Sequence, residues 1–207
     1  MAKTSAFDEN VSAYDAWFDA NRQLYQAELE ALRGFIPPQG RGVEIGVGTG
    51  RFAVPLGITV GVEPSPRMAD LARKRGVQVI EGVAEALPFA DGTFDFVLMV
   101  TVVCFLEDVT RAFREAFRIL RPGGILIVGF IDRDGELGRY YRKRKGQSSF
   151  YRQATFYSAT ELEGCMAEAG FSRFVYRQTL FPGRSGSQPV EDGHGKGSFV
   201  VVRAVKR

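Results

Sequence analysis

A glycine-rich turn that follows an apolar segment constrains the fold of this chain more than any other feature of its sequence. Residues 42–48, GVEIGVG, are short, apolar and rich in β-branched side chains, which is typical of a strand buried on both faces. Gly46, Gly48 and Gly50 stand at alternate positions, where the missing Cβ atoms let the backbone turn sharply and approach a ligand. We therefore expect a strand, a tight turn and a helix, with the turn at the carboxyl edge of a sheet.

Apolar runs recur along the rest of the chain at the spacing of an α/β domain. Six further strands are predicted, at 58–62, 77–82, 94–100, 125–130, 174–180 and 198–205. Strands that alternate with helices form parallel βαβ units with right-handed crossovers. The last two runs have no helix between them. The sequence thus predicts a doubly wound, Rossmann-like α/β fold with a mostly parallel seven-stranded sheet and one antiparallel strand near the C-terminus.

The helices are predicted from the spacing of apolar residues and from their end signals. Apolar residues at helical spacing indicate helices over 8–33, 68–75 and 109–120. The S-x-x-E pattern at the start of 158–169 is a capping box, which begins a fourth helix.

Bulk composition predicts one soluble domain. The chain has 207 residues, 45% hydrophobic and 25% charged, so we expect a single domain over 1–207. A net charge of +3 does not require a nucleic-acid partner. The first residues have no apolar signal segment, and no run approaches the roughly 20 apolar residues of a membrane span. We therefore expect a cytoplasmic protein with no membrane contact, as a monomer or a dimer.

The spacing within the turn indicates which nucleotide it binds. A dinucleotide fingerprint, G-x-G-x-x-G, requires glycine at position 51, where Arg51 stands, and the chain contains no P-loop. Glu63 falls at the end of the second predicted strand, where a carboxylate accepts hydrogen bonds from ribose hydroxyls. A ligand with an adenosine, an amino-acid end and no phosphate fits this pattern best, and a nicotinamide-dependent oxidoreductase is disfavoured.

Five segments resemble, in order, motifs of the class I S-adenosylmethionine-dependent methyltransferases, the small group related to the ubiquinone- and menaquinone-biosynthesis methyltransferases. They are VEIGVGTG at 43–50, GVEPSP at 61–66, GVAEALPF at 82–89, FDFVLMVT at 94–101 and ILRPGG at 119–124. Two departures are Glu44, where aspartate is commoner, and Val47, where cysteine is commoner. Both keep the charge or the apolar character of the position.

The resemblance implies a site for S-adenosylmethionine and its product S-adenosylhomocysteine. The residues implied are Glu44, Gly46, Gly48 and Gly50 around the methionine part, Glu63 at the ribose, Pro64 and Met68 on the adenine face, Ala84 and Glu85 beside the adenine, Val100 and Thr101 near the sulfonium, and Tyr14 in a lid. No metal site is expected, because the chain lacks the spacing of a metal-ligand cluster.

Two segments outside these motifs are candidates for covering the site. Residues 1–38 are expected to form a helical lid with the aromatic cluster Tyr14, Trp17 and Phe18. An insertion at 134–157 is expected to form part of the acceptor pocket. Its basic part, 139–153, is interpreted as a solvated helix face, as a grip on an anionic small acceptor, or as an RNA-binding segment.

The leading hypothesis is a methyltransferase that acts on an unidentified small-molecule acceptor. An RNA or protein methyltransferase and a non-catalytic S-adenosylmethionine-binding protein remain alternatives. No second substrate-binding domain is evident, and the motif of amino methylation is missing after the fourth predicted strand, at 101–108. Candidate general bases are His194, Asp132 and Asp134, and no catalytic residue is assigned.

Overall fold

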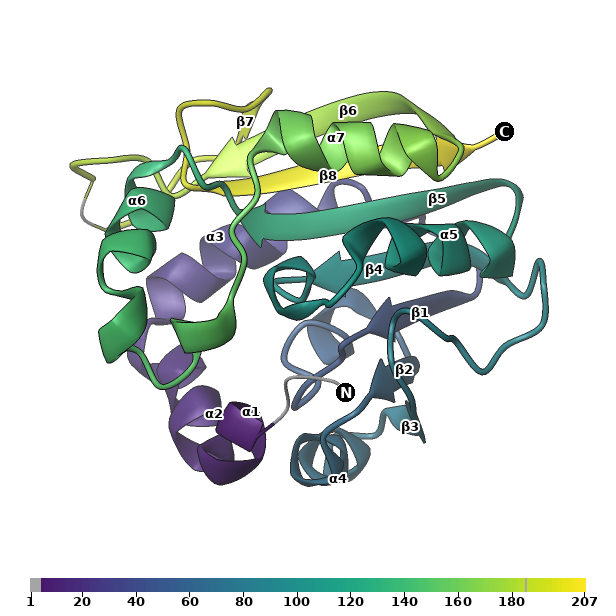
Figure 1. The fold of residues 1–207 in the computed structure, drawn as a ribbon, viewed down its shortest axis with the longest axis horizontal. Helices are drawn as coiled ribbons and strands as arrows, with labels where there is room; N and C mark the ends of the chain where they lie inside the picture. Colours follow the sequence, from purple (N-terminus) through teal and green to yellow (C-terminus); the bar gives the residue numbers. More distant parts are fainter. Residues whose placement is uncertain (1–4, 185) are drawn as a thin grey trace.

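The sequence folds around one twisted sheet, with helices packed on both of its faces (Figure 1). The computed structural model describes residues 5–184 and 186–207. The strands are β1 Gly42–Ile45, β2 Val60–Glu63, β3 Gln78–Glu81, β4 Phe94–Val100, β5 Leu120–Ile131, β6 Phe171–Thr179, β7 Glu191–Asp192 and β8 Phe199–Lys206. Their order across the sheet is β3-β2-β1-β4-β5-β8-β6-β7. The chain order reverses between β1 and β4, and such a switch point opens a crevice at the carboxyl edge.

The sheet confirms the predicted doubly wound fold and adds one strand to it. β1 to β5 pair in parallel, and β8 lies antiparallel between β5 and β6. The eighth strand, β7, consists of two residues, Glu191 and Asp192, that pair with Gln178 and Arg177 of β6. The prediction of seven strands was short by this one, because two acidic residues give no apolar pattern.

The predicted long helix over 8–33 is three helices. α1 spans Ser5–Glu9, α2 spans Val11–Ala20 and α3 spans Arg22–Arg33. The breaks fall at Asn10 and Asn21, whose short polar side chains compete for backbone hydrogen bonds. The Asn21 Nδ2 donates to the Trp17 carbonyl at 2.9 Å and so closes the end of α2. Residues 1–4 of the predicted lid lie outside the described residues.

The helix expected directly after the glycine turn is reduced to a three-residue 3₁₀ turn, η1, at Val54–Leu56. Gly57 ends it in the left-handed region, with a φ of 73°. The chain then reaches β2 at once, so there is no room for a full helix. The later helices are α4 Pro66–Lys74, α5 Val109–Ile119, α6 Glu136–Lys143 and α7 Ala159–Glu168, and the predicted capping box at the start of α7 is present.

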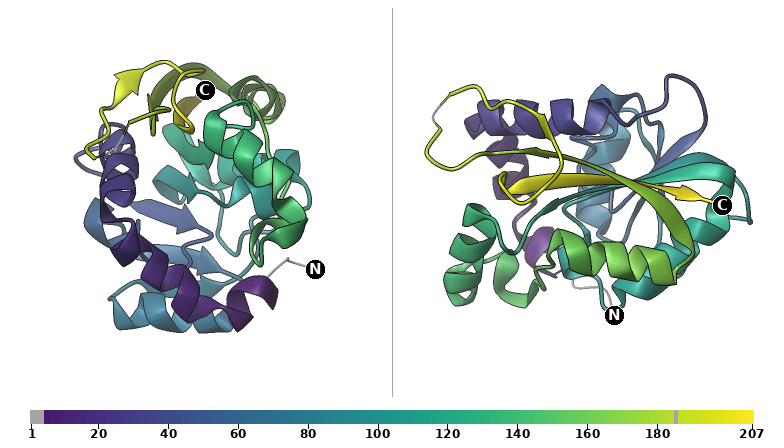
Figure 2. Two further views of the ribbon diagram at one scale, coloured as in Figure 1. Left: turned by 90° about the vertical axis from the view of Figure 1, so that its left-hand side faces the viewer. Right: turned by 90° about the horizontal axis from the view of Figure 1, so that it is seen from above.

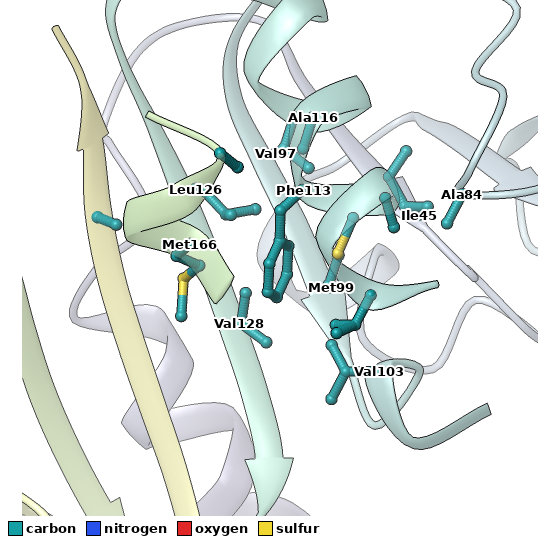
Figure 3. Close-up of a cluster of buried hydrophobic side chains, with 14 of the residues drawn as sticks. Ile45, Ala84, Val97, Met99, Val103, Phe113, Ala116, Leu126, Val128 and Met166 are labelled. Carbon is teal, nitrogen blue, oxygen red and sulfur yellow. The ribbon is translucent and has the colours of Figure 1, made fainter. Parts of the chain in front are cut away.

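Two hydrophobic cores hold the sheet rigid, one on each face. Val97 and Met99 of β4 point to the face covered by α5 and α7, where they meet Phe113 and Met166 (Figure 3). Leu98 lies in the opposite core, under α3. This alternation along one strand is the period-two pattern of a doubly covered sheet.

The segments that cover the carboxyl edge come from two distant parts of the chain. Figures 1 and 2 show α1 and α2 below that edge, and α6 with the chain that follows it above. Two short 3₁₀ turns, η3 Lys145–Gln147 and η4 Tyr151–Gln153, continue from α6. The carboxyl edge of the sheet is therefore covered by two separate segments, the N-terminal helices and the segment that begins with α6.

Candidate active site

A cavity of about 840 Å³ lies at the carboxyl edge of the parallel strands. Its walls include Gly46 after β1, Glu63 at the end of β2, Thr101 after β4 and Ile131 at the end of β5. A volume of this size accommodates a drug-sized ligand. The cavity thus occupies the place where the strand order predicts ligand binding.

The glycine turn forms one wall because its backbone adopts conformations that side chains disfavour. Gly46, Gly48 and Gly50 have φ values of 71°, 56° and 82°. A Cβ on Gly46 would lie 2.5 Å from the Cγ2 of Val102. Gly46 and Gly48 line the cavity, whereas a Cβ on Gly50 would meet Ala72 and Val77 at 3.4 Å. The third glycine therefore serves the packing of α4, and the first two form the cradle.

Glu63 is held by the glycine turn and by the start of α4. Its Oε2 accepts the backbone N–H of Gly48 and its Oε1 accepts that of Ser65, both at 2.9 Å. Burial raises the pKa of Glu63 to about 7, against the lowering effect of these two hydrogen bonds. Each oxygen keeps a second lone pair, which can accept a hydroxyl hydrogen.

Glu44 lies inside β1, directly before the turn, and is buried. Its Oε2 has no hydrogen-bond partner among the described residues. Burial raises the pKa of Glu44 well above its usual value, although a hydrogen bond from the Ala53 backbone lowers it in part. Glu44 does not line the cavity itself. An unpaired buried oxygen in a native structure is explained by a functional role of the group or by a bound water or ion.

The remaining residues predicted for the cofactor also line this cavity. They are Pro64, Met68, Ala84, Glu85, Val100, Thr101 and Tyr14. The Oε1 of Glu85 accepts the backbone N–H of Glu107 at 2.9 Å, which ties this segment to the loop before α5. Thr101 has a φ of 52°, a strained value for a β-branched residue, so the chain after β4 turns abruptly beside the cavity.

The lid helix α2 is fastened to the glycine turn by ion pairs. Asp15 forms ion pairs of 2.7 Å with Arg51 and with Arg75, and it accepts a hydrogen bond of 2.7 Å from the hydroxyl of Thr49. Tyr14 is consequently held over the turn. Burial raises the pKa of its hydroxyl, and the charges of Glu44 and Glu63 raise it further.

The insertion presents aromatic rings to the cavity and basic groups to solvent. Tyr140, Tyr141, Phe150 and Tyr151 line the cavity. Among the basic residues of this segment, Arg144 reaches the cavity rim, where it lies 4.8 Å from the centre of the Tyr140 ring and donates to its hydroxyl. The insertion thus behaves as an amphipathic cover.

One buried acid at this site was missed by the sequence reasoning. Glu28 of α3 lines the cavity, and burial raises its pKa to about 8. The signal was present in the sequence, because Glu28 lies three residues after Tyr25 and four before Leu32, on the predicted apolar face. A charged residue on such a face indicates a paired or functional group.

The proposed general bases do not belong to the site. His194, Asp132 and Asp134 lie outside the cavity lining. The ring of His194 packs 4.7 Å from that of Tyr176, and an oxygen of Asp132 accepts the backbone N–H of Asp134 at 2.9 Å. In the described part of the chain, no group of three or more His, Cys, Asp or Glu side chains is suited to a metal ion, and no helix is long and apolar enough to cross a membrane.

The two glycines of the turn, Glu63 and the buried Glu44 thus lie together at the carboxyl edge of the sheet, where doubly wound folds bind nucleotide-like ligands. A family model described as a methyltransferase domain matches residues 43–128. A crystal structure described as a SAM-dependent methyltransferase is 53% identical over 99% of this chain. The chain therefore belongs to the class I S-adenosylmethionine-dependent methyltransferases, and S-adenosylmethionine is its methyl donor.

Relatives cover the whole chain. A crystal structure from Thermotoga maritima, described as a SAM-dependent methyltransferase and possible histamine N-methyltransferase, is 53% identical, with a TM-score of 0.95 over 99% of this chain and 100% of that one. An uncharacterized protein of Methanocaldococcus jannaschii is 45% identical over 98% of this chain and 99% of its own length. One of Mycobacterium tuberculosis is 42% identical over 99% of this chain and 75% of its own.

Proposed function

We propose that this enzyme methylates a small molecule bound in the same cavity as the methyl donor, between the lid and the insertion. The observation that carries this proposal is the two-sided lining of the cavity. Motif residues such as Gly46 and Glu63 line one part, and rings of the insertion such as Tyr141 and Tyr151 line another. The second part lies outside the motif residues assigned to the donor and is available to an acceptor.

The donor site is assigned as follows. Gly46 and Gly48 approach the methionine part, with Glu44 behind them supplying negative charge for its ammonium. Glu63 accepts the ribose hydroxyls, as its position at the end of β2 favours. The adenine lies against Pro64, Met68, Ala84 and Glu85, the sulfonium lies near Val100 and Thr101, and Tyr14 covers the turn.

S-Adenosylmethionine supplies a methyl group that is already activated by a positively charged sulfur. The contribution of the chain is alignment and the exclusion of water. The Asp15 ion pairs hold the lid over the turn, and the aromatic faces of the lid can stabilise a nearby cation. The described residues place neither a histidine nor an aspartate of the predicted base set at the cavity.

The contact between α1 and the insertion above the cavity favours a small acceptor over RNA. Phe7 of α1 and Phe150 of the insertion pack with their ring centres 5.6 Å apart. A polymer entering the cavity would have to separate them. The description of the Thermotoga maritima relative names a small amine, which agrees with an acceptor of this size. The resemblance to the ubiquinone and menaquinone methyltransferases concerns motifs of the donor site and does not extend to the acceptor.

The test combines donor binding with tracing of the methyl group. The purified enzyme is incubated with methyl-labelled S-adenosylmethionine and separate small-molecule, RNA and protein fractions. We expect label in the small-molecule fraction. The Glu63→Ala variant loses affinity for S-adenosylhomocysteine, whereas Glu81→Ala, at the exposed end of the neighbouring strand β3, keeps it. Label that enters only RNA or only protein contradicts the proposal.

A further inference from the structure

Glu28 is a buried carboxyl that the donor site does not use. Its side chain is on α3, the residue is 4% exposed, and it lines the cavity. No hydrogen bond or ion pair joins it to a residue that the structure describes. Its oxygens are not among the fully enclosed atoms without a partner, which agrees with their access to the cavity. Burial of such a group costs free energy unless a partner compensates it. A ligand bound in the cavity can supply the group that compensates the Glu28 carboxyl.

The surroundings of Glu28 place it between the donor site and the insertion. Burial raises the pKa values of four tyrosine hydroxyls, and the charge of Glu28 adds to the rise at each of them, at Tyr14, Tyr25, Tyr141 and Tyr151. Tyr14 belongs to the lid over the glycine turn, whereas Tyr141 and Tyr151 belong to the insertion. Tyr14, Tyr141 and Tyr151 line the same cavity as Glu28, so a ligand that reaches Glu28 shares the cavity with these rings.

The cationic side chains of the cavity do not neutralise this acid. Arg111 is exposed, and its Nε donates to the Glu85 carbonyl at 2.9 Å. Arg144 is engaged with the ring and the hydroxyl of Tyr140. Neither forms an ion pair with Glu28. Two arginines, Arg111 and Arg144, line the cavity, and the acids that line it outnumber them: Glu28, Glu63, Glu85, Glu107 and Asp108. This excess of acids favours a cation over an anion.

We propose that Glu28 recognises the methyl acceptor, which is an amine with an aromatic body. The Glu28 carboxylate binds the protonated amino group, the rings of the lid and the insertion pack against the aromatic body, and the amine nitrogen is the atom that receives the methyl group. This inference rests on the proposed function, since it fills the acceptor part of the same cavity. It excludes the interpretation of the basic insertion as a grip on an anionic acceptor.

The same carboxylate can also receive the proton that blocks the reaction. A protonated amine has no free electron pair. One N–H bond breaks, the proton forms an O–H bond with Glu28, and the electron pair of the broken bond stays on the nitrogen. Burial raises the pKa of Glu28 to about 8, closer to the value of about 10.4 that is typical of an alkyl amine such as lysine. The transfer is therefore less uphill than it is to an exposed carboxylate.

Three probes of one shape and different charge test this proposal. They are 2-phenylethylamine, 2-phenylethanol and 3-phenylpropionate, titrated by calorimetry into the protein saturated with S-adenosylhomocysteine. We expect the amine to bind about tenfold or more tightly than the alcohol or the acid, because a hydrogen bond to a charged group is worth about 1.5–3 kcal/mol. Glu28→Gln removes this preference. Glu30→Gln, at an exposed position of the same helix, retains it.

The outcomes separate this inference from the proposed function. Equal affinity for the amine and the alcohol, tighter binding of the acid, an unchanged preference in Glu28→Gln, or no binding of any probe overturns the role of Glu28. Saturation with S-adenosylhomocysteine is measured first and independently of the probes. A folded protein that fails this first step contradicts the donor site instead. Circular dichroism of Glu28→Gln verifies that the variant is folded.

Discussion

Asp15 of the lid helix forms an ion pair of 2.7 Å with Arg75, the residue that caps the end of α4. Burial alone raises the pKa of Asp15, but hydrogen bonds from Arg75, Arg51 and Thr49 lower it below its usual range. Arg51 directly follows Gly50 of the glycine turn, and Arg75 donates to the Thr49 carbonyl of that turn at 2.7 Å. The position of the lid is therefore coupled to the backbone of the turn.

Substitution of Asp15 is expected to loosen the lid. Asp15→Asn leaves two arginines without their main partner, which weakens binding of S-adenosylhomocysteine by about tenfold, the effect of one charged hydrogen bond. Hydrogen exchange in α2 becomes faster. Asp19→Asn is the control, because Asp19 also pairs with Arg51 but its side chain is 72% exposed. Equal effects of the two variants in calorimetry would show that the pairing with Arg75 is unimportant.

Tyr14 is expected to contribute through its ring. The ring packs against those of Phe7 and Phe18 at centre distances of 5.9 and 5.3 Å, and it lines the cavity above Gly48. Tyr14→Ala removes this ring and lowers the affinity for S-adenosylhomocysteine by about tenfold. A buried aromatic contact contributes about 1 kcal/mol in addition to the free energy of burying its surface area. Tyr14→Phe keeps the ring and most of the affinity. An unchanged dissociation constant for Tyr14→Ala places the residue outside the donor site.

Alanine substitutions at Gly46 and Gly57 distinguish the cost of an unfavourable φ from the cost of a steric clash. Gly46→Ala forces a Cβ against the Cγ2 of Val102 at 2.5 Å and keeps an unfavourable φ of 71°. Gly57→Ala has a similar φ of 73°, but its Cβ meets nothing within 4 Å. We expect urea unfolding to show a loss of about 1 kcal/mol for Gly57→Ala and about 2–4 kcal/mol for Gly46→Ala. Donor binding is lost in Gly46→Ala and retained in Gly57→Ala.

The fold could be predicted from the sequence where a strand is buried on both faces. β4 is apolar at every position except Asp95, and its pattern predicts a strand without any knowledge of its neighbours. β7 could not be predicted in this way, because its acidic pair gains its structure from the adjacent residues of β6. The N-terminal helix also breaks at Asn21, whose side chain donates to the Trp17 carbonyl, and such local hydrogen bonds compete with helix continuation.

The donor side of the cavity was predictable for a different reason. The glycines and Glu63 are close in sequence to the strand ends that position them, so the motif and the geometry coincide. The side of the cavity that we propose for the acceptor is assembled from α3 and the lid and from the insertion, which is far from them in sequence. Glu28 lies in this second part. Its charge on an apolar helix face was visible, but the absence of a partner is a property of the folded chain.

The affinity for the donor product is expected to depend on pH through Glu63. Its pKa in the free protein is about 7, and ribose hydroxyls donate to the ionised carboxylate. Below pH 7 the carboxyl must lose a proton before it binds, so affinity falls by up to about tenfold per pH unit. Above pH 7 the affinity is level. Calorimetry of Glu63→Gln should give weak binding without this dependence, whereas a matching slope in that variant assigns the titration to another group.

The burial of Glu28 is expected to make the free energy of unfolding depend on pH. Its folded pKa, about 8, exceeds the value of 4.5 for an unperturbed glutamate. The folded state thus binds more protons, and its free energy of unfolding falls as pH rises from 4.5 to 8. Glu28→Gln cannot ionise, so we expect it to unfold with a free energy about 1–4 kcal/mol higher than the wild type above pH 8.

Urea denaturation across this range measures that difference. The advantage of Glu28→Gln over the wild type grows with pH and then becomes constant. Glu30→Gln, whose carboxyl is exposed and 3.5 Å from Arg33, serves as the matched variant and shows no such trend. A constant difference at all pH values would indicate that the ionisation of Glu28 does not oppose folding.

The contact between Phe7 and Phe150 joins the beginning of the chain to a segment more than a hundred residues later. Under the proposed function, donor and acceptor share the cavity beneath this contact, so release of the products requires the two covers to separate where Phe7 meets Phe150. In many enzymes the opening of such a cover, and not the chemical step, limits turnover.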